Sequence, residues 1–284
     1  MNAPTLWIIA PIFLGALLLF ITNQRILSVL GGSAALALAL IAQFVPIELA
    51  LKLGPFSVKI DSSLTVLGRV LLIQSSEGPL LTLIYGAAAL WFFGAQASKT
   101  APRLVPFGFM IIALMVASIA VEPFLYAALF IEMAILLAIP MLTSIHRPPG
   151  RGVVRFLIYQ TLAMPFILLA GWMLAGVEAS PGDLALAAQS GAMLGLGFAF
   201  LLAIFPLYSW IPLLLEDTSP YLVGFLLWIL PTMTVIFGAG FLDRYSWLRS
   251  SSQLILALRS IGLLMIVTGG AFAAFQRHLG RIMA

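Results

Sequence analysis

The stretch P-F-L-Y-A-A-L-F-I-E-M-A-I-L-L-A-I-P-M-L-T-S-I, residues 123–145, decides the fold class of this chain. It is long and apolar enough to cross the hydrocarbon core of a bilayer, which takes about 20 helical residues. Glu132 is its only Asp, Glu, Lys, Arg or His. Because a carboxyl at the bilayer midplane is costly, Glu132 is the first candidate functional residue.

The composition of the whole chain agrees with this stretch. Of 284 residues, 62% are hydrophobic and 8% are charged, and the mean hydropathy is +1.14. A soluble domain carries about 25% charged residues. We therefore expect an all-α integral membrane protein embedded in a lipid bilayer. The basic residues are scattered through short loops, so nucleic acid is not an expected partner.

Nine apolar stretches predict membrane-spanning helices, at about 5–22, 27–47, 78–96, 105–121, 124–143, 154–176, 188–208, 221–241 and 255–275. Residues 48–77 differ, because they mix charged and apolar residues. Within them, 53–61 alternates and contains Gly-Pro, which predicts a short strand or hairpin at the surface. We expect residues 62–75 to form an amphipathic helix in the membrane interface. A tenth span here is the alternative, and it would invert the topology of everything that follows.

Helix-breaking prolines lie inside several of the predicted spans, with Pro140, Pro165, Pro206 and Pro231 as the candidates. Each removes a backbone hydrogen bond and is expected to kink its helix. Broken helices are common where ions or protons pass. The alternative explanation is that proline is simply more frequent in membrane helices.

The loop charges favour one orientation. With nine spans, the two sides of the membrane carry eight and six Lys or Arg residues. The positive-inside rule then puts the N-terminus outside and the C-terminus in the cytoplasm. The densest basic cluster, H-R-P-P-G-R-G-V-V-R (146–155), lies on the cytoplasmic side in this arrangement.

Two acids are candidates for a proton relay, and each has a second interpretation. In the first interpretation Glu132 exchanges a proton as its surroundings change. In the second it stays protonated and hydrogen-bonds a neighbouring helix, so that it only stabilises helix packing. Glu122 stands ten residues earlier, ahead of Pro123, at the outer end of the fourth span. It is either an entry point for protons or a solvated boundary residue.

The most distinctive stretch is F-A-F-L-L-A-I-F-P-L-Y-S-W-I-P-L-L-L-E-D-T-S-P, residues 198–220. It places a cluster of proline and aromatic residues at the end of a charge-free helix, namely Pro206, Tyr208, Trp210 and Pro212. Tyrosine and tryptophan favour the membrane interface, so Tyr208 and Trp210 are alternatively no more than anchors. Glu216 and Asp217 would then be ordinary loop acids.

The F-P-L-Y-S-W-I-P core, residues 205–212, resembles a signature of the antiporter-like membrane subunits. These subunits occur in respiratory complex I, in membrane-bound hydrogenases and in multi-subunit sodium/proton antiporters, and they read F-A-x-K-x-P-x-x-P-L-H-x-W-L-P. L-F-I-E-M (129–133) resembles their F-x-x-W-E-L and places the family glutamate at Glu132. The tail A-A-F-Q-R-H-L-G-R-I-M-A (273–284) resembles A-x-x-Q-x-D-L-K-R-L-L-A, and residues 155–160 fit the basic, aromatic start of a span. The match covers about residues 120–284.

The sequence departs from the family at its basic positions. The family lysine that pairs with the glutamate is Leu201 here, and the next family lysine falls near residues 232–234, where no basic residue exists. The signature histidine is Tyr208, and the tail lysine is Gly280. Lysine is absent after Lys99. Any proton path through the later helices must therefore work without lysine.

The resemblance also implies a domain organisation. Family members contain two inverted five-helix units, and an odd number of helices in each unit makes the repeat inverted. Here it implies N-terminal helices over 1–104 with an interfacial segment at 48–77, one antiporter-like unit over 105–242, and the first helix of an incomplete second unit over 253–284.

The resemblance implies a non-redox membrane-arm subunit of a proton- or ion-translocating complex in the plasma (inner) membrane of a prokaryote. Its expected partners are the other membrane subunits. In one alternative the chain is a split half, and a partner chain supplies the missing helices and lysines. In the other it is a degenerate subunit that supports the membrane arm structurally but conducts no ions. No cofactor is expected in this chain. The sequence does not distinguish protons from sodium.

Two other function classes are alternatives to this one. An independent carrier of small solutes or ions has generic support from kinked helices and a polar bundle interior, but the sequence shows no polar cluster large enough to bind a solute. A membrane enzyme would need a nucleophile, a metal set or paired acids. The chain has no cysteine, and its histidines, His146 and His278, lie far apart beside arginines. We therefore expect no catalytic residues and no metal site.

Overall fold

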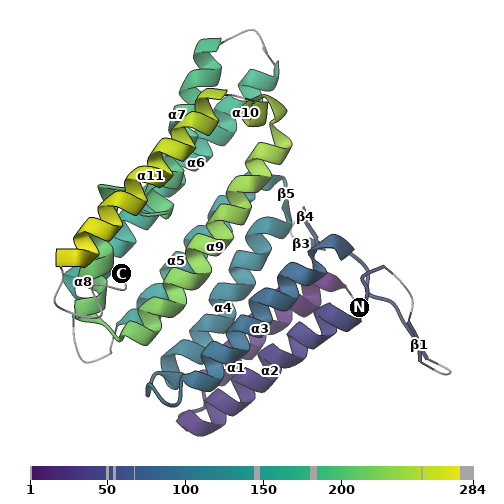
Figure 1. Ribbon diagram of the computed structural model, residues 1–284. Helices are drawn as coiled ribbons and strands as arrows, with labels where there is room; N and C mark the ends of the chain where they lie inside the picture. The colour runs from purple at the N-terminus through teal and green to yellow at the C-terminus, as the bar shows by residue number, and fades with distance from the viewer. Residues whose placement is uncertain are drawn as a thin grey trace. The chain divides into compact units, whose positions relative to one another are not determined.

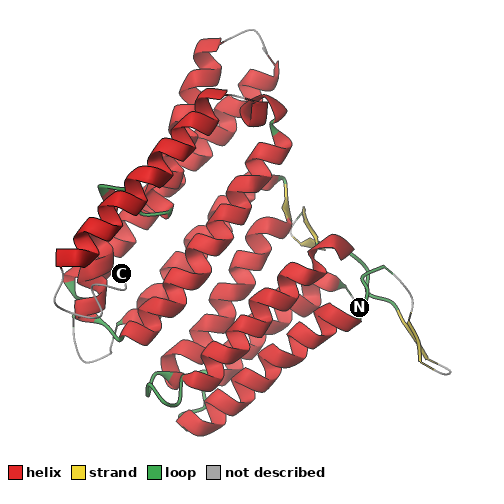
Figure 2. Ribbon diagram, viewed as in Figure 1, coloured by secondary structure: helices red, strands yellow, loops and turns green. Residues whose placement is uncertain are grey.

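The structure is a computed structural model that describes residues 2–48, 51–53, 56–66, 68–143, 148–179, 184–250 and 252–275. Helices dominate these residues (Figure 2), which confirms the expected all-α class. The chain divides into two compact units, Met1–Met141 and Leu142–Ala284. The expected antiporter-like unit, 105–242, extends across the boundary between them and stays a prediction.

Six helices are long and apolar enough to cross a membrane, namely α2 (Gln24–Phe44), α4 (Ala101–Ala120), and the spans Phe124–Leu142, Arg151–Leu174, Pro220–Arg244 and Leu254–Phe275. The three other predicted spans are also helical but shorter: Thr5–Leu18, α3 (Gly78–Gly94) and α7 (Leu184–Leu201). The architecture is therefore that of a helical membrane protein, and the count of nine spans stays a prediction.

The first unit is built around α4, which packs against α1 (Ala10–Leu18), α2 and α3 (Figure 1). Nearly every side chain of α4 is buried. Glycines let the backbones approach closely: a Cβ at Gly15 would lie 2.6 Å from the carbonyl of Pro106, and one at Gly32 would lie 2.5 Å from the Phe93 ring. Small residues at such crossings are typical of helices packed in a membrane.

A buried polar network holds the start of this unit. Pro11 has no N–H to donate to the carbonyl of Trp7, four residues earlier, and Thr5–Ile9 winds as a π-helix (η1). The Tyr85 hydroxyl from α3 donates to that carbonyl, while the Trp7 indole N–H donates to the carbonyl of Leu38 on α2 at 3.3 Å. Tyr85 and Trp7 are fully buried. The Tyr85 hydroxyl therefore replaces the backbone bond that Pro11 removes.

The expectation for residues 48–77 is partly confirmed and partly wrong. A hairpin of β1 (Leu51–Leu53) and β2 (Phe56–Val58) is present as predicted. The predicted interfacial helix at 62–75 is instead a second hairpin, β3 (Ser63–Val66) and β4 (Arg69–Leu72). The alternating S-L-T-V pattern and a turn containing Gly68 at φ 74° favour strands. Four-residue strands are too short for a tenth span.

The second unit contains α6 (Arg151–Ala179), α7, a 3₁₀ turn η4 (Leu207–Ser209), α8 (Trp210–Asp217), α9 (Pro220–Arg244), α10 (Ser246–Ser250) and α11 (Ser252–Phe275). Helix α6 packs against both α7 and α8, and α9 contacts α7, α8 and α10. Helix α11 is exposed along most of its length.

The predicted helix breakers fall into two groups. Pro140, Pro165 and Pro231 lie inside α5 (Ala127–Leu142), α6 and α9. Pro206 lies outside any helix, because α7 ends at Leu201. Pro206 has no N–H for the carbonyl of Leu202, and its ring would clash with that carbonyl in a helix, so the expected span at 188–208 ends early. Pro106, inside α4, was not among the predicted breakers.

Some of the sequence predictions fall on residues outside this description. His146 and Arg147 of the basic cluster, and the tail motif after Phe275 with His278 and Gly280, lie outside the described residues. The expected segment 253–284 is described as a helix only as far as Phe275.

Candidate functional site

Glu132 lies near the centre of the span Phe124–Leu142. Its neighbours Ile131 and Ile135 are buried, while Leu129 and Met133 are exposed, so Glu132 sits at the edge between the two faces of α5. The side chain is half-buried, and its Oε2 atom is enclosed. A carboxyl in this position is shielded from solvent on one side and close to the exposed face on the other.

Glu122 lies ten residues before Glu132 in the sequence and outside the helix. It is exposed on the short strand β5 (Val121–Glu122), which pairs with β4 so that Glu122 faces Val70. Next to this strand, the Arg69 guanidinium stacks 4.0 Å from the centre of the Tyr126 ring and donates to its hydroxyl. The second hairpin therefore braces the loop that leads into α5.

The helix break after Leu201 is held by a residue whose role the sequence did not predict. The amide nitrogen of Gln160, on α6, donates to the carbonyls of Phe200 at 3.4 Å and Leu201 at 3.3 Å. These carbonyls belong to the last residues of α7 and lack the donors of a continuing helix. Gln160 is 2% exposed. At Leu201 the structure thus has an apolar side chain, and a neutral amide is bonded to its backbone carbonyl.

The aromatic residues of the signature pack inside the second unit. Trp210 begins α8 and lies 5.1 Å from the Phe156 ring of α6, measured between ring centres. Because Trp210 is only 4% exposed, the anchor interpretation is wrong for this residue. The centre of the Tyr208 ring lies 6.0 Å from the centre of the Phe205 ring and 5.6 Å from that of Phe272. Pro212 lies in the first turn of α8, where a missing N–H removes no necessary bond.

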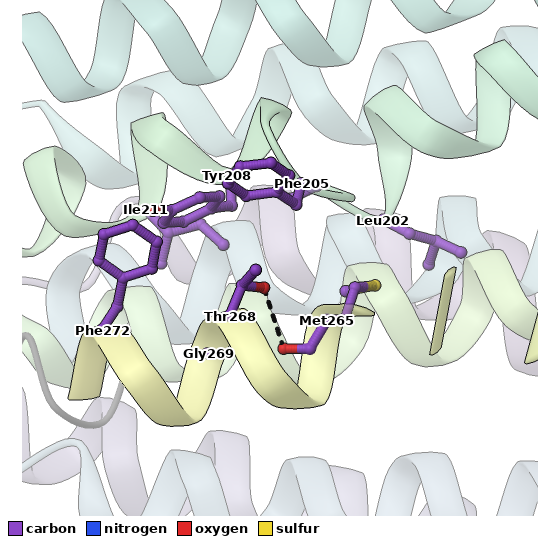
Figure 3. A pocket seen from close by; sticks show the side chains of 9 residues that line it. Leu202, Phe205, Tyr208, Ile211, Met265, Thr268, Gly269 and Phe272 are labelled. Atoms are coloured by element: carbon purple, nitrogen blue, oxygen red, sulfur yellow. Dashed lines mark hydrogen bonds between the residues drawn. The ribbon is translucent and has the colours of Figure 1, made fainter. Parts of the chain in front are cut away.

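A pocket of about 200 Å³ lies between the break and α11 (Figure 3). Its walls are mostly apolar, and include Leu202, Phe205, Ile211, Met265 and Phe272. Tyr208 also lines it, and the Thr268 hydroxyl already donates to the carbonyl of Leu264 at 2.7 Å within its own helix. This lining suits hydrocarbon and offers little to a polar solute.

A second, smaller cavity of about 30 Å³ brings together residues that the sequence singled out separately. Leu201, Trp210 and Pro231 all line it, together with Gln160. Three helices and the break meet here, within the second unit. Pro206 and Tyr208 are outside this lining, and Glu132 and Glu122 belong to the first unit.

Asp217, one of the two acids after residues 205–212, makes a specific contact to another helix. Asp217 ends α8, and its Oδ2 accepts a hydrogen bond of 2.5 Å from the backbone N–H of Gly152, in the first turn of α6. A carboxylate at a helix N-terminus satisfies a free donor and is favoured by the helix dipole. The expectation of an ordinary loop acid is therefore wrong for Asp217.

The described residues contain no group of three His, Cys, Asp or Glu that could hold a metal ion. No protein-family model matches this sequence, and no curated protein matches it significantly. The antiporter-like resemblance therefore stays a prediction from the motifs.

Proposed function

We propose that this chain is a non-redox membrane subunit of a multi-subunit proton- or ion-translocating complex. Glu132 is its remnant proton-relay carboxyl. The observation that carries the proposal is the position of Glu132, half-buried at the centre of an otherwise apolar span. Ionisable residues at that depth are rare, and they commonly mark ion or proton pathways.

The broken helix α7 supports the same proposal. Its last carbonyls point to a neighbouring amide, Gln160, and an apolar residue, Leu201, stands where the resembling family has a lysine. In the resembling family that lysine sets the charge of the relay carboxyl. In the proposed complex a basic residue of another subunit takes over this role, so this chain does not conduct alone.

The proposal is tested by isolating the chain in mild detergent from its native membranes. We expect it to migrate as part of a large assembly, at fixed stoichiometry with other membrane subunits and with the subunits that catalyse the driving reaction. If it instead migrates alone, and the purified chain moves a solute across liposomes, the proposal is wrong and the independent carrier is correct.

A further inference from the structure

The indole N–H of Trp210 is a buried donor. Trp210 is 4% exposed, and its Nε1 atom is enclosed. No acceptor lies within hydrogen-bond distance of this nitrogen in the part of the chain that the structure describes. Because an unpaired buried N–H is unfavourable, native proteins nearly always satisfy such a group, often with an ordered water molecule.

The lining of the same cavity also includes a residue whose backbone carbonyl has no helical donor. Pro231, inside α9, has no N–H to give to the carbonyl of Leu227, four residues earlier. Leu227 and Pro231 line the 30 Å³ cavity together with Trp210. In an apolar environment a freed carbonyl needs another partner.

The cavity has room for one water molecule, since a volume of about 10–15 Å³ for the water centre is enough. We propose that it holds a single buried water that accepts a hydrogen bond from Trp210 Nε1 and donates one to the carbonyl of Leu227. Gln160, whose amide donates to the carbonyls of Phe200 and Leu201, also lines this cavity. Water fits this set because it both accepts and donates, whereas a cation would face the positive end of the indole N–H.

This water site lies between the break after α7 and Pro231 inside α9. It joins α8, which carries Trp210, to α9, next to the end of α7 that Gln160 caps. The inference does not depend on the proposed function, because it follows from the donor, the acceptor and the cavity in one unit of the chain.

The direct test is a high-resolution map of the protein, purified with the chains that accompany it. We expect one ordered density within hydrogen-bond distance of both Trp210 Nε1 and the Leu227 carbonyl. An empty cavity, or a protein acceptor on Nε1, would overturn the inference.

Two variants sharpen this test. Trp210→Phe keeps the aromatic packing on Phe156 but removes the donor, and Pro231→Ala returns a backbone N–H to the carbonyl of Leu227. Both are expected to abolish the density, whereas the control Trp172→Phe, at a 72% exposed position on α6, retains it. Density that persists in both variants would show a water held by other groups, which contradicts the proposed bonds.

Thermal stability gives a second readout that does not need a map. Pro231→Ala leaves Trp210 and its packing in place and gives the Leu227 carbonyl a backbone donor. If that carbonyl is already bonded to water, Tm should change little, whereas an unsatisfied carbonyl predicts a clear rise in Tm. A clear rise in Tm would therefore also overturn the inference.

Discussion

Asp217 shows what a single carboxylate contributes when it caps a neighbouring helix. Replacing it with alanine leaves the Gly152 N–H without its 2.5 Å partner. Asp217→Ala is expected to lower the free energy of unfolding by about 1 kcal/mol, measured by thermal unfolding in detergent. Asp217→Asn keeps an acceptor and should cost less.

Asp243 provides the matched control for Asp217. It contacts Arg249 at 3.3 Å, and both side chains are 73% exposed. Exposed ion pairs contribute little, so Asp243→Ala should leave stability nearly unchanged. Equal losses for the Asp217 and Asp243 alanine variants would contradict the capping role.

Glu77 makes stability depend on pH. Burial raises the pKa of this carboxyl, and a hydrogen bond from the Gln74 backbone N–H partly opposes the rise. The folded state therefore binds the proton more tightly than the unfolded state, and stability is lost as pH rises through the two pKa values. Glu77→Gln should raise Tm at neutral pH and leave it unchanged below about pH 4. A gain that is the same at both pH values would contradict this explanation.

Single residues also show where sequence reasoning works and where it stops. The position of Glu132 near the centre of an apolar span follows from the hydropathy of the residues around it, so it was predictable from the sequence. The roles of Gln160 and Asp217 depend on partners 41 and 65 residues away. No local pattern reports such contacts. The only available signal was a polar side chain in an apolar helix, which marks Gln160 as a residue that needs a partner.

At the scale of helices, replacing glycine with alanine should have opposite effects on the free energy of unfolding at two positions, Gly152 and Gly191. A Cβ at Gly152 would lie 2.6 Å from the carbonyl oxygen of Leu213 on α8, whereas a Cβ at Gly191 on α7 would meet nothing within 4 Å. Gly152→Ala should therefore lower the free energy of unfolding by roughly 1–3 kcal/mol, because backbone must move. Gly191→Ala should raise it by roughly 0.5–1 kcal/mol through helix propensity.

Thermal unfolding of both variants under one set of conditions checks this pair. If Gly152→Ala is tolerated as well as Gly191→Ala, then α6 and α8 do not approach as closely as described. The comparison isolates packing, since both glycines lie in helices and both changes add one methyl group.

The elements that sequence reasoning misjudged were short ones. Residues 62–75 contain enough apolar and charged residues to suggest a helix, yet Ser63–Val66 and Arg69–Leu72 form a hairpin. In a window of this length, periods of 2 and 3.6 residues are hard to separate. The pairing of β4 with β5, some 50 residues later, adds stability that no local pattern contains.

At the scale of the whole molecule, the hydropathy of the chain predicts a membrane protein, and six helices are long enough to cross a bilayer. Large apolar side chains are exposed along α11, including Leu256, Ile266 and Phe275. Such a face is stable against lipid or another subunit and unfavourable in water. The pattern does not fix the number of spans, because helix ends depend on breaks and caps such as those at Leu201 and Gly152.

The central claim is that Glu132 belongs to an ion-translocating assembly. The most direct test is Glu132→Gln in the purified assembly, reconstituted in liposomes, with ions moved per turnover of the driving reaction as the measurement. Glutamine keeps the shape and hydrogen bonding of a packing residue but holds no exchangeable charge. With the Asp243→Asn variant as control, we predict that Glu132→Gln lowers this ratio while the driving reaction continues. An unchanged ratio would contradict the relay role of Glu132.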